Sequence, residues 1–285
     1  MNKSLLAILS ILVFVNLIVW GQAYSAVPRV SSNELVVAYL DVGQGDAIYV
    51  QSPNGNQMVI DGGPNNALMG ALPDVVPFGD KSIDVIVITN PDADHMSGFV
   101  PLLEEYDVSA VVEPGTYSDT TLYKELVKSI TNENSEHILA RSGMKIILDE
   151  EKNIYFEILF PDRDVSDWER NDGSIVGRLV YNQNSFLFMG DATTLTEGLV
   201  VSGHDISDTD VLKIGHHGSK TSTGIALLRE SRPEIGIISV GADNRYGHPH
   251  KEVLERLGTY EIPYLETSTS GTIVLVSDGE KIVRK

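Results

Sequence analysis

Two carboxylates and an imidazole lie within four residues in the segment Asp92-Ala93-Asp94-His95. They directly follow the apolar run 83–88, which predicts a strand buried on both faces. Carboxylates crowded at the end of a buried strand repel one another unless a cation or a hydrogen-bond donor lies among them. The segment therefore predicts a metal site. A polar turn in which Asp92 or Asp94 caps the following helix is the simpler alternative.

The same arrangement recurs along the chain, because other predicted strands also end in groups that can bind a metal. The strands 57–60, 185–189, 210–214 and 234–240 lead to Asp61, Asp191, the pair His216 and His217, and the pair His248 and His250. Antiparallel strands at 34–40, 48–51 and 57–60 precede a strand and helix at 83–106, which indicates an α/β protein with a mixed sheet. No linker or repeat interrupts residues 34–285, so we expect one domain there.

Composition restricts the chemistry. The chain has 285 residues, 40 acidic against 21 basic, and a formal net charge of −19. Such a charge repels phosphate, which excludes a protein that coats nucleic acid, so a polyanionic substrate must be held by local basic groups or by metal ions. The absence of cysteine excludes disulfides and thiolate zinc sites.

Residues 1–26 differ from the rest of the chain. Lys3 is their only charged residue, and the run from Leu5 to Trp20 is apolar apart from Ser10 and Asn16. This pattern predicts a signal peptide or an N-terminal membrane anchor. Either alternative places the remainder outside the cytoplasm, secreted or anchored to the membrane by its N-terminus.

Four blocks of this sequence together resemble the metallo-β-lactamase-fold hydrolases, and most closely the hydrolase domain of ComEC-type competence proteins. They are residues 40–47 (LDVGQGDA), 90–95 (NPDADH), 189–191 (MGD) and 212–219 (LKIGHHGS). The resemblance implies an αββα sandwich with a metal site at the sheet edges between its halves. It also implies a metal-dependent hydrolase of phosphodiester or ester bonds. Single-stranded DNA, in a nuclease connected with DNA uptake, is the substrate it favours.

The resemblance assigns roles position by position. One ion would be held by Asp94, His95 and one member of the pair His216 and His217. Asp191 would bridge two ions, and Asp61 would orient a ligand. Adjacent histidines usually point in opposite directions, so we expect only one of the pair to reach the metal, with His217 favoured.

The second metal position departs from the family pattern. The family motif begins with His where this chain has Asn90, and the segment 170–174 lacks the usual third histidine. A second site would then consist of Asp92, Asp191 and Asn90 or Asn171. Oxygen ligands suit Mn²⁺ and imidazole suits Zn²⁺, so we expect one or two divalent ions, Zn or Mn, with the site at Asp92 the weaker.

A hydrolytic mechanism assigns the remaining polar residues. Asp94 would orient the attacking water, and His248 or His250 would protonate the leaving oxygen. Phosphoryl oxygens would be held by the groups of Lys213, Ser219 and Lys220. The alternative is a catalytically impaired, membrane-anchored module that binds metal or another protein.

Overall fold

The computed structural model describes residues 33–133 and 135–285. The expected signal or anchor at 1–26 lies outside the described residues. Within the described ranges, no helix is both long and apolar enough to span a bilayer.

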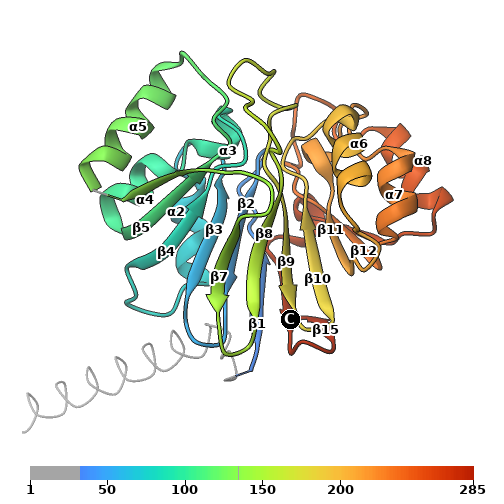
Figure 1. Cartoon of the computed structure of the whole chain (residues 1–285), viewed down its shortest axis with the longest axis horizontal. Helices are drawn as coiled ribbons and strands as arrows, with labels where there is room; N and C mark the ends of the chain where they lie inside the picture. Colours follow the sequence, from blue (N-terminus) through green and yellow to red (C-terminus); the bar gives the residue numbers. More distant parts are fainter. Residues whose placement is uncertain (1–32, 134) are drawn as a thin grey trace, which may run out of the picture.

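Two β-sheets pack face to face at the centre of the molecule (Figure 1). The first has eight strands in the order β15-β14-β1-β2-β3-β4-β5-β6. Its strands are β1 (Leu35–Tyr39), β2 (Ala47–Gln51), β3 (Gln57–Gly62), β4 (Ser82–Val87), β5 (Asp107–Glu113), β6 (Glu136–Leu139), β14 (Ile273–Ser277) and β15 (Ile282–Arg284).

The second sheet has seven strands in the order β13-β12-β11-β10-β9-β8-β7. They are β7 (Lys145–Asp149), β8 (Ile154–Phe160), β9 (Val176–Tyr181), β10 (Asn184–Phe188), β11 (Val211–Lys213), β12 (Ile235–Ile238) and β13 (Tyr264–Glu266).

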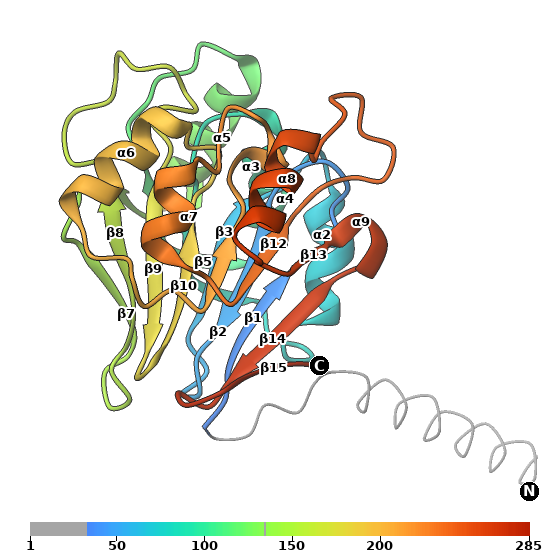
Figure 2. The same ribbon diagram turned by 90° about the vertical axis from the view of Figure 1, so that its right-hand side faces the viewer.

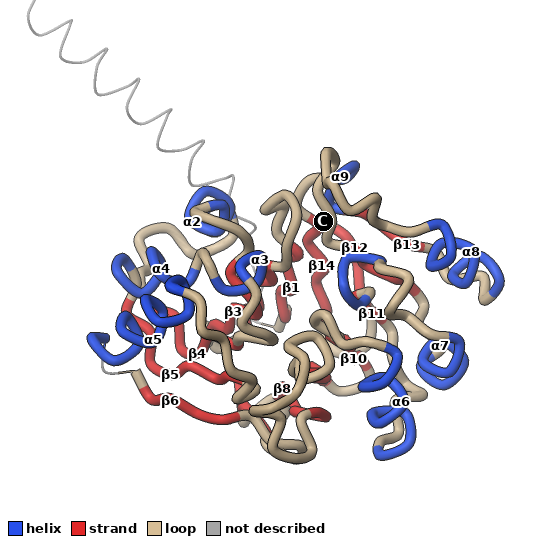
Figure 3. Tube along the Cα trace, turned by 90° about the horizontal axis from the view of Figure 1, so that it is seen from above, coloured by secondary structure: helices blue, strands red, loops and turns tan. Residues whose placement is uncertain are grey.

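Helices cover the outer face of each sheet, so the expected four-layer αββα sandwich is confirmed (Figure 3). Helices α2, α4 and α5 lie on the first sheet, and α6, α7 and α8 lie on the second. The helices are α2 (Ala67–Ala71), α3 (Ala93–Met96), α4 (Phe99–Glu105), α5 (Thr121–Glu133), α6 (Thr194–Gly203), α7 (Ile225–Ser231), α8 (Lys251–Thr259) and α9 (Thr267–Ser270). Two 3₁₀ turns are η1 (Leu72–Asp74) and η2 (Gly215–Gly218).

Alternation along the strands builds the layers. On β10, Phe186 and Phe188 enter the core between the two sheets, whereas Leu187 packs against the helices of the second sheet. Because successive strand side chains point to opposite faces, a strand buried on both sides must be apolar at nearly every position. The apolar runs of the sequence therefore correspond to the central strands.

The parallel pairing of neighbouring strands places the polar residues that follow them at the same edge of each sheet. Strands β3 and β4 are parallel, as are β10, β11 and β12. Parallel neighbours end at the same sheet edge, so the loops that follow β3 and β4 lie together, and so do those that follow β10 and β11. Helices α3 and α6, which follow β4 and β10, both lie toward the upper edge of the molecule (Figures 1 and 2).

The antiparallel strands predicted at 48–51 and 57–60 are confirmed as the hairpin β2–β3, and the strand predicted at 185–189 is confirmed as β10. The structure adds strands β5, β6, β13 and β15 and helices α6 and α7, which the sequence analysis did not predict. Several of these elements are short or lie at sheet edges, where fewer neighbours enforce a clear apolar pattern.

Candidate metal centre

Asp61 orients the imidazole of His95. It lies at the end of β3, and its Oδ2 is 2.8 Å from Nδ1 of His95, which belongs to α3. Thr89 donates its backbone N–H and its hydroxyl to the same carboxylate, each at 2.7 Å. Since the carboxylate only accepts, Nδ1 of His95 carries the proton and its Nε2 presents a lone pair. That Nε2 lies 3.1 Å from Oδ2 of Asp191.

His217 approaches from the second sheet. Its Nδ1 lies 3.0 Å from the carbonyl oxygen of Ser239 and 3.3 Å from Oδ1 of Asp46, so this ring is also held by oxygen acceptors at Nδ1. Its Nε2 lies 3.5 Å from Oδ2 of Asp94 and 3.6 Å from Oδ1 of Asp191. Both histidines thus direct Nε2 to the same place, and this nitrogen can bind a metal once it has lost its proton.

His216 also faces Asp191, although among the described residues the groups of converging ligand atoms contain His217 and not His216, so the expectation of a single ligand from this pair stays a prediction. Its Nε2 lies 3.6 Å from Oδ2 of Asp191, as close as the Nε2 of His217 lies to Oδ1. The reason is the backbone of η2, in which His216 and His217 have φ of 49° and 54°. Two consecutive left-handed residues turn the chain tightly, so both rings leave on one side. Such conformations cost free energy and concentrate at functional sites.

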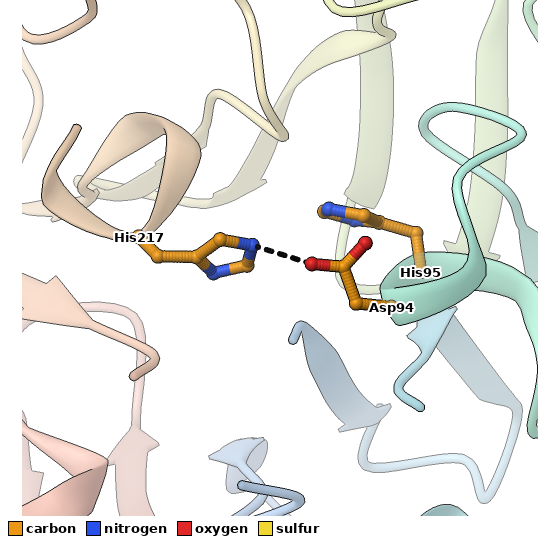
Figure 4. A group of neighbouring side chains, drawn as sticks. All are labelled: Asp94, His95 and His217. Carbon is orange, nitrogen blue, oxygen red and sulfur yellow. Dashed lines mark ion pairs between the residues drawn. The ribbon is translucent and has the colours of Figure 1, made fainter. Parts of the chain in front are cut away.

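The structure brings together Asp94, His95 and His217, as Figure 4 shows. Their ligand atoms lie within 4.8 Å of one another, as do those of Asp46, His95 and Asp191. Within the part of the chain that the structure describes, four buried atoms of these groups have no hydrogen-bond partner: Nε2 of His95, Nε2 of His217, Oδ1 of Asp191 and Oδ1 of Asp46. Buried polar atoms are rarely left unpaired, and lone pairs that converge in this way fit a divalent cation.

The titration behaviour agrees with this interpretation. Burial disfavours the charged form of His217, but the carboxylates of Asp191 and Asp46 outweigh it and raise its pKa to about 10. For His95, burial is likewise outweighed by Asp191 and Asp61, and its pKa rises well above the usual value. Strongly shifted pKa values at a cleft mark functional sites. In the metal-free protein a proton thus takes the position of a cation, and metal binding has to release it.

Asp46 is the site residue that the sequence analysis missed. It is 1% exposed, and its Oδ2 lies 2.8 Å from Nζ of Lys213. Asp46 lies in the block 40–47, and the preceding Gly45 could have indicated that the chain here lies close to another segment. A Cβ at Gly45 would lie 2.4 Å from the carbonyl oxygen of Asp94, so only glycine lets this loop reach the metal loop. The N–H of Asp46 donates to that carbonyl at 3.2 Å.

Lys213 cannot hold a phosphoryl oxygen, which corrects the expectation. Its side chain is 1% exposed, and its ammonium also donates to the carbonyl oxygen of Ile214 at 2.9 Å. A buried ammonium needs a paired anion, and Asp46 supplies it. Lys213 therefore stabilises the buried carboxylate of Asp46, which in turn contacts His217.

The residues expected at a second metal position are arranged differently. Oδ1 of Asp92 lies 2.6 Å from Nη1 of Arg170, and Oδ1 of Asn90 accepts the backbone N–H of Asp92 at 2.9 Å. Asn171 has a buried Oδ1 without a partner among the described residues. Asp92 precedes α3, but its side chain caps no N–H of the helix, so the simple capping alternative does not describe it.

The other predicted catalytic residues separate into two groups. Among them, only His248 joins Asp94 in lining the hollow above the metal centre. His250 begins α8, and its Nδ1 accepts the backbone N–H of Lys220 at 3.1 Å, so its role there is structural. The hydroxyl of Ser219 is 3.0 Å from that of Thr221, and neither Ser219 nor Lys220 lines the hollow.

The expected role of His248 in protonating a leaving group stays a prediction. Its burial, together with the charges of His217, His250 and His216, lowers its pKa to about 4. A group with this pKa is neutral at pH 7 and is a weak base.

Three adjoining hollows open along the metal centre. The central hollow, of about 340 Å³, is lined by Gln44, Asp92, Ala93, Asp94, Asp191, His216, His217, Tyr246 and His248. The Tyr246 hollow shares Gln44, Ala93, Asp94 and Tyr246 with it. The Arg170 hollow shares Asp92 with it and is otherwise lined by Glu169, Arg170, Asn171, Asp172 and Thr193. Because each outer hollow shares lining residues with the central one, the three are called the groove below.

Residues 40–242 match the Metallo-beta-lactamase superfamily. The chain belongs to this superfamily. Its most similar curated relatives include "ComE operon protein 3" of Bacillus subtilis (strain 168), 28% identical over 85% of this chain and 33% of the relative. "Recombination protein 2" of Haemophilus influenzae is 29% identical over 82% and 28% of the two chains. "Competence protein ComA" of Neisseria gonorrhoeae is 27% identical over 86% and 32%. The chain thus spans about a third of the length of these relatives.

Solved structures agree on the fold. The metallo-beta-lactamase fold protein YhfI of Bacillus subtilis superposes with a TM-score of 0.58 at 11% identity, covering 85% of this chain and all of YhfI. A CmlA beta-hydroxylase gives 0.53 at 12% identity, covering 88% of this chain and 54% of the other. The superfamily, the ComEC-like relatives and the converging ligands establish a metal-dependent hydrolase fold with a site compatible with a divalent metal.

Proposed function

We propose that this chain is a metal-dependent phosphodiesterase that cleaves single-stranded DNA outside the cytoplasm. The observation that carries the proposal is the convergence of unpartnered, buried Nε2 atoms of His95 and His217 on Asp191, beside the 31% exposed carboxylate of Asp94. A structural ion would be enclosed on all sides, whereas this one would face a hollow that a substrate can enter.

The site residues divide the chemical work. When bound, a divalent ion supplies Lewis-acid activation of water and of the phosphoryl group. Asp94 is ionised, because the neighbouring imidazoles of His217 and His95 outweigh the effect of its burial and lower its pKa. Its exposed oxygen can therefore orient the attacking water.

The groove supports an elongated substrate. The three hollows meet at the metal centre, so a polymer chain can cross it without wrapping around the protein. This matches the net charge of −19, which disfavours extensive contact with a phosphate backbone. Arg170 in one outer hollow and Arg245 in the other offer local positive charge at both ends of the groove. The names of two relatives refer to recombination or competence, which supports DNA as the polymer.

The test uses the purified full chain, stripped with a chelator and reloaded with Mn²⁺ or Zn²⁺. Its substrates are bis-p-nitrophenyl phosphate and an end-labelled single-stranded oligonucleotide. We expect turnover of both that depends on metal and disappears in Asp191→Asn. The matched control is Asp162→Asn, which changes an exposed aspartate paired with Arg163.

Metal binding without turnover of either substrate would contradict the enzymatic proposal and favour a metal-binding interaction module. Hydrolysis of p-nitrophenyl acetate but of no phosphodiester would indicate an esterase. Location is tested separately by protease accessibility of the chain in intact cells.

A further inference from the structure

A row of three aromatic rings leads outward from the metal centre. The ring centroids of His217 and His248 are 6.4 Å apart with an interplanar angle of 28°, and those of His248 and Tyr246 are 5.6 Å apart at 23°. Both pairs have the spacing of offset-stacked rings. His217 is buried at the metal centre, whereas Tyr246 is 51% exposed. The row therefore ends in an aromatic ring that a ligand can reach.

The loop that carries Tyr246 is held in place by Asn244. The side-chain amide of Asn244 donates to the carbonyl oxygens of Gly241 at 2.9 Å and of His248 at 2.8 Å. Its Oδ1 accepts the backbone N–H of His248 at 2.9 Å. Gly247 has a φ of 73°, a left-handed conformation that glycine adopts without strain. Because three hydrogen bonds close the loop on both sides of Tyr246, the ring is held in a fixed position, which lowers the cost of binding a partner there.

The surroundings of Tyr246 favour an uncharged planar ligand. Tyr246 lines both the central hollow and the Tyr246 hollow, and Asp94 lines both as well. The Tyr246 hollow also contains Asp243, so its two carboxylates disfavour a phosphate group. A neutral ring meets no such repulsion. The nucleobases of a DNA strand are neutral planar rings, and they stack on tyrosine.

Arg245 adds a cation at the hydroxyl end of Tyr246. Its Nη2 donates to the Tyr246 hydroxyl at 3.2 Å, and its guanidinium carbon lies 5.2 Å from the ring centroid. Proteins that bind single strands without sequence preference combine aromatic rings with arginine, because every base has a π face and a guanidinium can also contact it. The exposed pair of Arg245 and Tyr246 has this composition.

We propose that Tyr246 stacks on a nucleobase of the substrate and thereby selects an unpaired strand. The inference rests on the proposed phosphodiesterase function and names the feature of the substrate that its site recognises. A base on the exposed ring extends the row that begins at His217, and it brings the strand to the wall that Tyr246 shares with Asp94. In a duplex the bases stack on one another, so a base must first leave the duplex before it can bind there.

The test compares two single-stranded substrates on the Mn²⁺-loaded full chain. One is an oligothymidylate, and the other has the same backbone with an abasic site in place of every base. We expect the wild type to prefer the first. Tyr246→Ala should lower kcat/KM for the oligothymidylate by about 5- to 150-fold, the range for losing one stack between a base and an aromatic ring, and should leave the abasic strand unaffected. Tyr246→Phe keeps the ring and should keep the preference.

Stacking is observed directly with 2-aminopurine in the strand, because its fluorescence falls when it stacks. Stopped-flow mixing before cleavage should show this fall with the wild type and with Tyr246→Phe, but not with Tyr246→Ala. The matched control is Tyr264→Ala, which removes a 38% exposed tyrosine of β13 that lies outside the three hollows. It should behave like the wild type in both measurements.

Three results would overturn the inference and leave the phosphodiesterase proposal standing. They are equal turnover of the two strands by the wild type, an unchanged preference in Tyr246→Ala, and an equal loss of turnover on both strands in that variant. Turnover of neither strand by the metal-loaded wild type would instead remove the proposed function, and the inference with it.

Discussion

Two imidazoles reach the metal centre from opposite sheets, and they are held in different ways. His95 is oriented by Asp61, whose carboxylate accepts hydrogen bonds from Thr89 and lies 2.8 Å from Nδ1 of His95. His217 is oriented by Ser239 and Asp46, and Asp46 is paired with the buried ammonium of Lys213. Each support places a buried carboxylate beside an imidazole, and the second adds a buried lysine.

The pKa values of Asp61 and Asp46 are shifted in opposite directions, in agreement with this difference. Burial raises the pKa of Asp61, because its hydrogen bonds and the charge of His95 offset the loss of water only in part. Burial also acts on Asp46, but the charges of Lys213 and His217 reverse it and lower its pKa. Comparable orientation of the two rings thus has different consequences for stability, because a buried ion pair is costly to break from one side.

We expect the largest effect on metal affinity from replacing Asp191, because its carboxylate contacts the histidines of both sides of the metal centre. Asp191 faces both Nε2 atoms, so Asp191→Ala should reduce metal affinity by more than the roughly 100-fold that loss of an outer partner costs, and hydrolysis should fall to the metal-free level. Equilibrium dialysis with Mn²⁺ or Zn²⁺ measures the affinity. Metal binding as tight as in the wild type would refute the shared role.

Lys213→Met should be the most destabilising change on the His217 side. It leaves the carboxylate of Asp46 buried without its main counter-charge, which costs about 3–5 kcal/mol. Urea denaturation of the metal-free chain measures the loss in free energy of unfolding. Lys220→Met, at an exposed position in the same region, is the control, and Lys213→Met with Asp46→Asn should recover part of the loss.

Asp61→Asn and Asp46→Asn compare the two supports directly. Each should lower metal affinity by about 10- to 100-fold, because each weakens the acceptor behind a ligand imidazole. Only Asp46→Asn should also lower stability markedly, since it leaves Lys213 buried without an anion. Metal titration combined with denaturation separates the two effects. Equal stability of both variants would show that the ion pair does not distinguish the two sides.

We expect the smallest effect from replacing Glu197, whose carboxyl group, unlike Asp61 and Asp46, does not orient an imidazole of the metal centre. This buried residue of α6 accepts the backbone N–H groups of Thr223 and Gly224, and burial raises its pKa from 4.5 to about 7. The folded state therefore binds a proton that the unfolded state has released between these values, so stability falls as pH rises from 4.5 to 7. Glu197→Gln should flatten this decrease by about 1–2 kcal/mol in urea titrations at pH 4.5 and 7.5. An unchanged slope would assign the pH dependence to other groups.

Much of the site was predictable because its residues lie directly after apolar strands. Asp61, His95 and Asp191 each follow such a run, and parallel strands collect their ends at one edge. Asp46 was not singled out, because its role depends on Lys213, which belongs to the other sheet. The orientation of the His216 side chain toward Asp191 depends on two consecutive residues with left-handed backbone conformation, which the local sequence does not predict.

The layered α/β fold and the types of metal ligand available could be predicted from the chain alone, because apolar periodicity and the absence of cysteine are properties of the sequence. Which charged groups contact one another became apparent only in the folded protein. Arg170 contacts Asp92, and Lys213 contacts Asp46, through the packing of segments far apart in the sequence. The hydrophobic effect is non-directional, so an apolar strand can be buried against many different apolar neighbours. An ion pair needs two particular charged groups at contact distance, and only folding brings those groups together.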